Sequence, residues 1–142
     1  MYVMRQNDIK SLAQSWSEVV PMANYQKVEE IEAKEASMPN VEVKDTTIQW
    51  LITKEKDEAP NFAMRRFVIK PGGTIGLHDH WYEHEILILA GKGVMYGDDR
   101  VENVVGRDDF VFVPGDEPHG YRNDGDEDFV FLCMIPNMDK KP

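Results

Sequence analysis

The chain has 142 residues, which is typical of one domain, and 42% of them are hydrophobic. Its formal net charge of −10 argues against nucleic acid or an anionic membrane as a partner, because both bind basic surfaces. The single cysteine excludes an internal disulfide and favours a reducing compartment. The N-terminal residues lack the apolar core of a secretory signal, and no apolar run is long enough to span a bilayer. We therefore expect a cytoplasmic location.

The N-terminal residues differ in pattern from the rest, and we expect an arm over 1–24 followed by one β domain over 25–142. In IKSLAQSWSEV (9–19) the apolar residues recur at helical spacing, and Pro21 ends the pattern, so the arm is expected to be partly helical. The run VEEIEAKEA (28–36) fits either a charged helix or an edge strand. We favour the strand.

From residue 43 onward the sequence indicates strands. Segments rich in β-branched and aromatic residues, such as TTIQWLIT (46–53) and FVFLCMI (129–135), alternate with turn signals about every ten residues. The strand FAMRRFVIK (62–70) is followed by one of these turn signals, KPGG (70–73). This rhythm predicts an all-β fold, either a sandwich or a barrel.

Alternation of side chains along a strand assigns each residue to one of two faces. In FAMRRFVIK, Arg66 and Lys70 mark the wet face, so Arg65 is expected to point inward among apolar residues. A buried arginine needs either a structural carboxylate partner or an anionic ligand, and both roles stay open. In FVFLCMI the predicted inward set is Phe129, Phe131, Cys133 and Ile135.

Two segments are apolar on both faces, namely ILILA (86–90) and FVFLCMI. Such strands need a cover on the outer side as well as the inner side. Either the N-terminal arm or a second subunit could supply it. A homodimer with twofold symmetry is the commonest solution, and we expect one here.

Three of the four histidines fall within LHDHWYEHEILILAG (77–91). On a strand, His78 and His80 would point to the same face with their Cα atoms about 6.6 Å apart. His84 has the same parity after a turn, and His119 lies in a second turn-then-strand segment. Neutral imidazole is a common ligand of divalent first-row metals, so the pattern predicts a metal site.

These two segments resemble the two motifs of the cupin superfamily. In the first motif, Gly72 and Gly91 flank the histidines at the cupin spacing, and His84 occupies the position where most cupins carry a glutamate. The second motif is matched by Gly106, Pro114, His119 and Asn123, with Asp116 in place of a glycine. The segments APNFAMRRF, WYEHE and FLCMIP look like a subgroup of small bacterial cupins with four histidines, several of which bind manganese.

The resemblance covers roughly residues 28–136. It implies a small jelly-roll barrel that holds one metal ion through His78, His80, His84 and His119. Glu85 is the alternative to His84, because the cupin pattern also allows one more residue before the glutamate. Parity favours His84, since neighbouring residues on a strand point to opposite faces. Glu83 could orient a histidine or simply be a solvated turn residue.

Four neutral ligands would leave a divalent ion with its full charge, which makes it a stronger Lewis acid than three histidines and a carboxylate would. Such a site favours an anionic or enolisable oxygen ligand. We favour Mn or Fe, with Zn, Ni and Cu as alternatives. The candidates for the wall of a substrate pocket are Arg65, Phe112, Tyr121, Phe131 and Cys133, each of which could instead serve core packing.

The expected function is that of a mononuclear metal-dependent oxidoreductase, either a dioxygenase or an oxidase. Its partner would be a small organic substrate that is anionic or enolisable. The alternatives are a metal-dependent isomerase or lyase that works through an enediolate, and a non-enzymatic module that binds a small molecule. Cys133 is expected to be inert, because no histidine is left to activate it.

Overall fold

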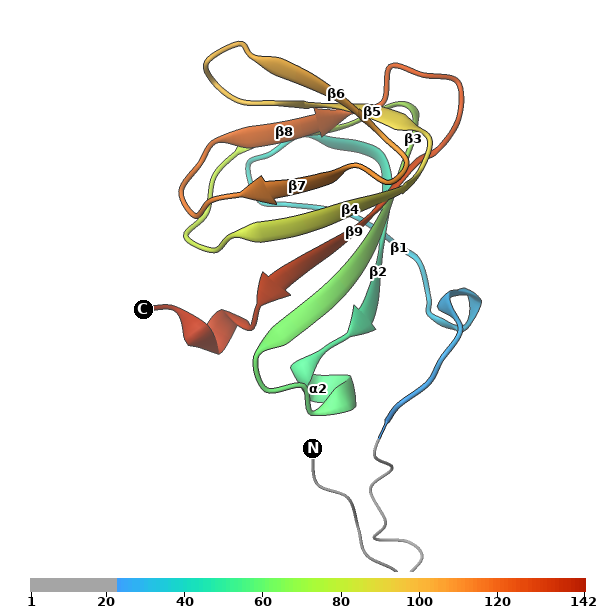
Figure 1. The fold of residues 1–142 in the computed structure, drawn as a ribbon, viewed down its shortest axis with the longest axis vertical. Helices are drawn as coiled ribbons and strands as arrows, with labels where there is room; N and C mark the ends of the chain where they lie inside the picture. Colours follow the sequence, from blue (N-terminus) through green and yellow to red (C-terminus); the bar gives the residue numbers. More distant parts are fainter. Residues whose placement is uncertain (1–22) are drawn as a thin grey trace, which may run out of the picture.

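A computed structural model describes residues 23–142 and shows one curled antiparallel sheet around a common core (Figure 1). The spatial order of its strands is β6-β5-β8-β3-β9-β4-β7, and β2 pairs with both β1 and β3. The prediction of an all-β barrel is therefore confirmed. The helix expected at 9–19 lies outside the described residues. No helix within residues 23–142 is long and apolar enough to cross a membrane.

The strands differ widely in length. They are β1 (Lys34–Glu35), β2 (Val43–Ile52), β3 (Phe62–His78), β4 (His84–Ala90), β5 (Lys92–Tyr96), β6 (Glu102–Gly106), β7 (Phe110–Val113), β8 (His119–Arg122) and β9 (Phe129–Pro136). The long β3 runs through KPGG, where a turn was expected. Gly72 absorbs the irregularity with a left-handed backbone (φ 80°), and its amide donates to the carbonyl of Asn123 across the sheet at 2.9 Å.

The helices are short connections: η2 (Val28–Glu30), α2 (Lys54–Asp57) and η3 (Met138–Lys140). The hydroxyl of Thr53 caps α2 by accepting from the amide of Lys56 at 3.0 Å. The run 28–36 is neither a helix nor a strand over its whole length. It begins with the single turn η2, and only the two residues of β1 pair with β2.

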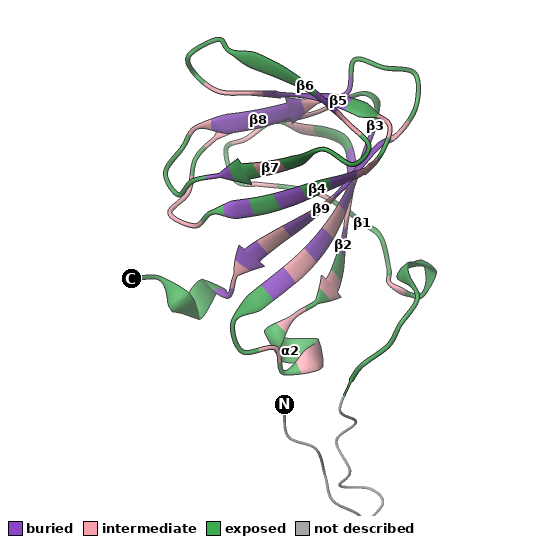
Figure 2. Ribbon diagram, viewed as in Figure 1, coloured by how far each residue is buried: buried purple, intermediate pink, exposed green. Residues whose placement is uncertain are grey.

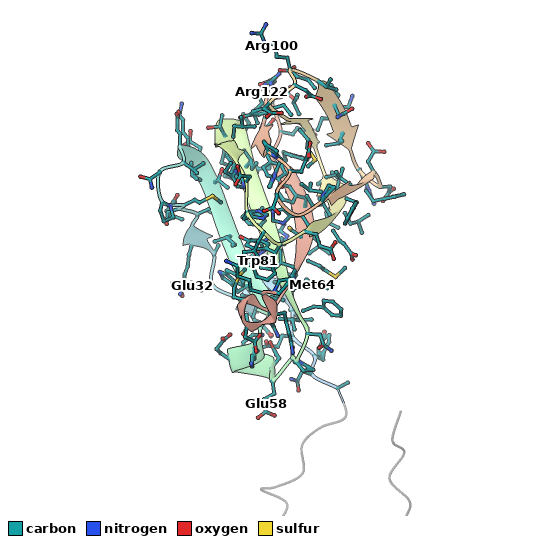
Figure 3. All side chains as sticks on the ribbon, turned by 90° about the vertical axis from the view of Figure 1, so that its left-hand side faces the viewer. Glu32, Glu58, Met64, Trp81, Arg100 and Arg122 are labelled. Carbon is teal, nitrogen blue, oxygen red and sulfur yellow. The ribbon has the colours of Figure 1, made fainter. Side chains whose placement is uncertain are left out.

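The inward faces of β3 and β9 are those that alternation predicts (Figure 2). All the residues predicted to point inward are buried, namely Ala63, Arg65, Phe67 and Ile69 on β3, and Phe129, Phe131, Cys133 and Ile135 on β9. Val130, on the other face of β9, is buried as well. Antiparallel register pairs Phe67 with Phe131, whose rings stack at 5.2 Å, and pairs Arg65 with Cys133. Side chains fill the space that the sheet encloses (Figure 3), so Arg65 is held inside a packed core.

The outer face of β7, β4 and β9 is apolar and exposed. Phe110 is 83% exposed, Phe112 57% and Leu87 43%. Register places Leu87 between Phe110 on β7 and Leu132 on β9, so these side chains are neighbours on one surface. The cover expected from the sequence is not supplied by any residue between 23 and 142.

Asn123 ties the loop between β8 and β9 to β3. It is only 1% exposed, and its Nδ2 donates to the carbonyls of Ile69 and Glu127 at 2.8 and 2.7 Å. Its Oδ1 accepts from the amide of Gly125 at 2.9 Å. The asparagine of the second motif is therefore a structural residue here, remote in role from metal binding.

Replacing Asn123 with Ala should lower the free energy of unfolding by about 1–3 kcal/mol, because buried carbonyl groups lose their donor. Urea titration followed by circular dichroism measures this quantity. Asn103→Ala, at an exposed position on β6, is the matched control and should leave stability unchanged. An N123A protein as stable as the wild type would show that these hydrogen bonds contribute nothing.

Candidate metal centre

Four histidines from three parts of the chain meet at one end of the barrel. His78 ends β3, His84 begins β4 and His119 begins β8, while His80 follows β3 in the connecting loop. Antiparallel register sets His78 directly opposite His119. One ring nitrogen from each histidine lies within 4.8 Å of the others. The structure thus brings together the whole predicted set.

Backbone carbonyl groups fix the ring protons of three of these histidines. The Nδ1 atoms of His78, His80 and His119 lie 2.7 Å from the carbonyl oxygens of Gly76, Tyr82 and Glu117, respectively. A carbonyl oxygen can only accept a hydrogen bond, so each Nδ1 carries the proton. Each Nε2 is therefore left with a free lone pair.

These lone pairs can be satisfied by a hydrogen-bond donor or by a cation that lies between them. The Nε2 atoms of His80 and His84 face each other at 2.7 Å, and the buried Nε2 of His119 has no hydrogen-bond partner. A cation bound by the four nitrogens would satisfy all of them, and imidazole nitrogen is the usual ligand for such an ion. The residues present therefore fit a divalent transition metal.

His84 and Glu85, the two alternative metal ligands, lie on opposite faces of β4. His84 is 4% exposed and points into the barrel, whereas Glu85 is exposed. Glu85 lies on the outer face between Phe112 and Met134. The parity argument from the sequence is confirmed. Glu83 is exposed as well and makes no hydrogen bond to any of the described histidines.

Comparison with known proteins identifies the fold family. Residues 65–135, half of the chain, match the family model of the cupin domain. The chain belongs to the cupin family. The match contains most of the long strand β3 and all four histidines.

This cupin is similar in sequence to two proteins whose names refer to different small molecules. It is 38% identical over 80 residues to the 1-methylthio-D-xylulose 5-phosphate methylsulfurylase of Rhodospirillum rubrum, covering 56% of this chain and 50% of that protein. It is 34% identical over 86 residues to an oxalate-binding protein of Thermotoga maritima, covering 60% of this chain and 70% of that protein. The chain therefore spans only half the length of the methylsulfurylase.

Solved structures share the cupin fold. A polyketide cyclase from Streptomyces resistomycificus matches with a TM-score of 0.75 and 29% identity, covering 81% of this chain and 80% of that one. A predicted oxalate decarboxylase from Thermotoga maritima matches with a TM-score of 0.67 and 26% identity, covering 78% and 96%. The jelly-roll expectation is thereby confirmed.

Burial keeps His80, His84 and His119 neutral. Burial lowers the pKa of His119 to about 4 and lowers the pKa of His80 as well. Burial also holds the pKa of His84 far below its ordinary value, and the nearby Arg65 guanidinium adds to the effect. Near neutral pH these imidazoles are uncharged, which is the form that binds a metal ion.

A small cavity of about 30 Å³ lies against the histidines. Four of the predicted wall residues line it, namely Arg65, Tyr121, Phe131 and Cys133. Met38 and Tyr82 line it too, and neither was predicted from the sequence. The ring of Tyr82 stacks on His80 with centroids 3.7 Å apart. Its position within WYEHE is the sequence feature that could have indicated that Tyr82 lies at the site. Met38 lies far from either motif and had no such signal.

The prediction that Phe112 lines this cavity is wrong. Val113 points inward on β7 and is 5% exposed, whereas Phe112 is 57% exposed on the outer face. The error is one of parity, because the inward positions of this short strand are the two valines that alternate with Phe110 and Phe112.

Arg65 has no acidic partner among residues 23–142. The side chain is 8% exposed, and its Nε makes no hydrogen bond. One terminal nitrogen donates to the sulfur of Cys133 at 2.9 Å and lies 3.1 Å from Nδ1 of His84. The guanidinium also lies 5.6 Å from the ring of Trp50 and 5.1 Å from the ring of Phe67. Two roles were predicted for Arg65, an ion pair with a structural carboxylate or the binding of an anionic ligand. The ion pair is absent from the described part of the chain.

Changing His84 to Ala should lower metal content or affinity strongly, because one of four buried donor nitrogens is lost. Glu85→Ala is the matched control on the opposite face of the same strand and should keep the wild-type metal content. Elemental analysis of protein purified without a histidine tag gives the stoichiometry. Retention of metal by H84A together with its loss from E85A would reverse the ligand assignment.

Proposed function

We propose that this cupin is a mononuclear metal-dependent oxidoreductase, a dioxygenase or an oxidase, that acts on a small organic anion. The observation that carries the proposal is the buried Arg65 guanidinium, which lines the same cavity as His78, His80 and His84. Mn and Fe are the proposed metals, with Zn, Ni and Cu as alternatives. The cytoplasmic location also belongs to the proposal and rests on the single cysteine.

Electrostatics supports an anionic substrate. With a divalent ion at the histidines, two positive centres would face one small cavity with no carboxylate in its lining. Buried charge is costly unless a partner of opposite sign offsets it. A carboxylate or enolate oxygen would supply that partner and accept from the free Nε–H of Arg65. The names of two relatives agree with this, since one contains a sugar phosphate and the other oxalate.

The residues of the chain would bind, orient and shield the substrate. Arg65 would hold its anionic group, while Phe67, Ile75 and Phe131 exclude water from the cavity. Burial raises the pKa of Tyr121 well above its ordinary value, so its phenol keeps its proton and can donate. When bound, a Mn or Fe ion would supply a Lewis acid and a one-electron couple.

The second candidate is an isomerase or lyase that works through an enediolate without redox change. It is favoured by the names of two similar proteins, a methylsulfurylase and a cyclase. A module that binds a small molecule without converting it is the third candidate, and the oxalate-binding relative favours it. All three candidates use the same cavity and the same arginine.

Oxygen uptake separates these candidates. The Mn- or Fe-loaded protein is expected to consume oxygen with at least one member of a panel of catechols, diketones and enols, and the metal-free protein is not. Conversion of a substrate without oxygen uptake would overturn the first candidate in favour of the second. Tight binding with no conversion would leave only the third.

Arg65→Met should weaken substrate or oxalate binding to the Mn-loaded protein by about 10- to 100-fold, because a charged hydrogen-bond donor is lost. Arg66→Met is the matched control, since Arg66 is the next residue and donates to Gln49 at 2.9 Å on the other face. Isothermal titration calorimetry with oxalate measures the affinity. Equal affinity in R65M and the wild type would remove the argument for an anionic substrate.

A homodimer is also part of the proposal, because the outer face of β7, β4 and β9 is exposed and apolar. An aromatic side chain contributes about 150–250 Å² to an interface, so two phenylalanines give a substantial apolar centre. Phe110→Asp should therefore convert a dimer into a monomer in light scattering. Val104→Asp, at a position 72% exposed on β6, should not. A monomeric wild type would contradict the proposal and would favour the N-terminal arm as the cover.

A further inference from the structure

His84 differs from the other three histidines in the surroundings of its Nδ1 atom. The others face a backbone carbonyl, which fixes the proton on Nδ1. Nδ1 of His84 instead lies 2.8 Å from the sulfur of Cys133 and 3.1 Å from a terminal nitrogen of Arg65. A guanidinium can only donate a hydrogen bond, so Arg65 favours a lone pair on Nδ1 of His84. A thiol can donate or accept, so Cys133 is the neighbour that can accept a hydrogen bond when Nδ1 carries the proton.

In the first arrangement the proton of His84 is on Nε2. It donates to Nε2 of His80 across 2.7 Å, and that atom is free to accept because the carbonyl of Tyr82 holds the His80 proton on Nδ1. Nδ1 of His84 then accepts from Arg65 at 3.1 Å. This arrangement satisfies both rings without a metal ion, but it leaves His84 unable to serve as a ligand.

In the second arrangement the proton of His84 is on Nδ1. It donates to the sulfur of Cys133 at 2.8 Å, and Arg65 donates to the same sulfur at 2.9 Å. Nε2 of His84 then has a free lone pair that points toward the other three Nε2 atoms. Only this arrangement provides a complete set of four nitrogen ligands.

We propose that Arg65 and Cys133 form a tautomer switch at His84. Arg65 holds the metal-free tautomer, and Cys133 holds the tautomer that binds metal. As the ion binds, one proton leaves Nε2 of His84 and one is placed on Nδ1, so this ring releases no net proton. Cys133 is thus a positioning residue that acts through His84. The inference rests on the proposed function only in requiring that the four histidines bind a metal.

Within residues 23–142, packing shields His84 and Cys133 from solvent. Cys133 is 1% exposed and His84 is 4% exposed, so water does not compete for either. Cys133 lies directly opposite Arg65 on β3 and opposite Ile86 on β4, two residues beyond His84. The rings of Trp50 and Phe67 lie beside the guanidinium and limit its movement.

Nitrogen NMR of ¹⁵N-histidine-labelled protein reads the tautomers directly. In metal-free wild type we expect the proton of His84 on Nε2 and the protons of the other three histidines on Nδ1. After addition of Zn²⁺, which is diamagnetic, we expect all four on Nδ1. A His84 ring that already carries its proton on Nδ1 without metal, or that stays unchanged when Zn²⁺ is bound, would overturn the switch.

Substitutions at Cys133 separate the switch from simple packing. Cys133→Ser keeps a hydrogen-bond acceptor and should bind Zn²⁺ within a few-fold of wild type, whereas Cys133→Ala removes it and should weaken binding about 10- to 100-fold. In C133A, the Zn²⁺-loaded protein should show a His84 that is not a ligand. Ile135→Val trims another buried residue of β9 and should leave Zn²⁺ affinity unchanged. Equal Zn²⁺ affinity in C133A and the wild type would overturn the role of Cys133.

The same experiments distinguish failure of the switch from failure of the metal site. If wild type binds no Zn²⁺, Mn²⁺ or Fe²⁺, the proposed function fails, and the metal-free spectrum still tests the position of the His84 proton. If wild type binds Zn²⁺ through four histidines while C133A and C133S behave alike, the metal site stands and the switch fails.

Discussion

The pairing of β3 is the constraint on which the rest of the structure depends. This strand pairs with β9 over its first half and with β8 near its end, and β2 lies along its other edge. The first half carries Arg65 and the last residue is His78, so one strand contributes to both sides of the cavity. The left-handed backbone of Gly72 lets the strand continue between them. Without that continuity, Arg65 and His78 would not line the same cavity.

Charge is distributed unevenly over this fold. The chain carries a net charge of −10, yet the acidic groups of residues 23–142 stay outside the cavity, whose described lining holds one cation and no carboxylate. Three histidines take their fixed tautomer from backbone carbonyls, one within β3 and two in the loops that precede β4 and β8. In the proposed switch, His84 takes its tautomer from the side chains of Arg65 and Cys133. The metal centre therefore combines three positions set by the main chain with one that depends on packing between β3, β4 and β9.

Much of this could be predicted from sequence, because strand alternation is strictly periodic. Parity alone placed Arg65 inside the barrel and favoured His84 over Glu85. On the short strand β7, Phe112 was predicted to line the pocket but lies on the outer face, and Val113 points inward instead. Met38 could not be found, because its contact with the site depends on how β1 and β2 wrap around the barrel. The proton of His84 also lay beyond prediction, since it depends on distances among three side chains.

The replacement of the usual cupin glutamate by His84 has a consequence for how the site retains its ion. A carboxylate would neutralise part of the metal charge permanently, whereas the cavity lining within residues 23–142 offers none. If the proposed metal and anion both bind, each would strengthen binding of the other by the same factor, because thermodynamic coupling between two ligands is reciprocal. Under the proposed function, the substrate would then be part of what keeps the metal in the protein.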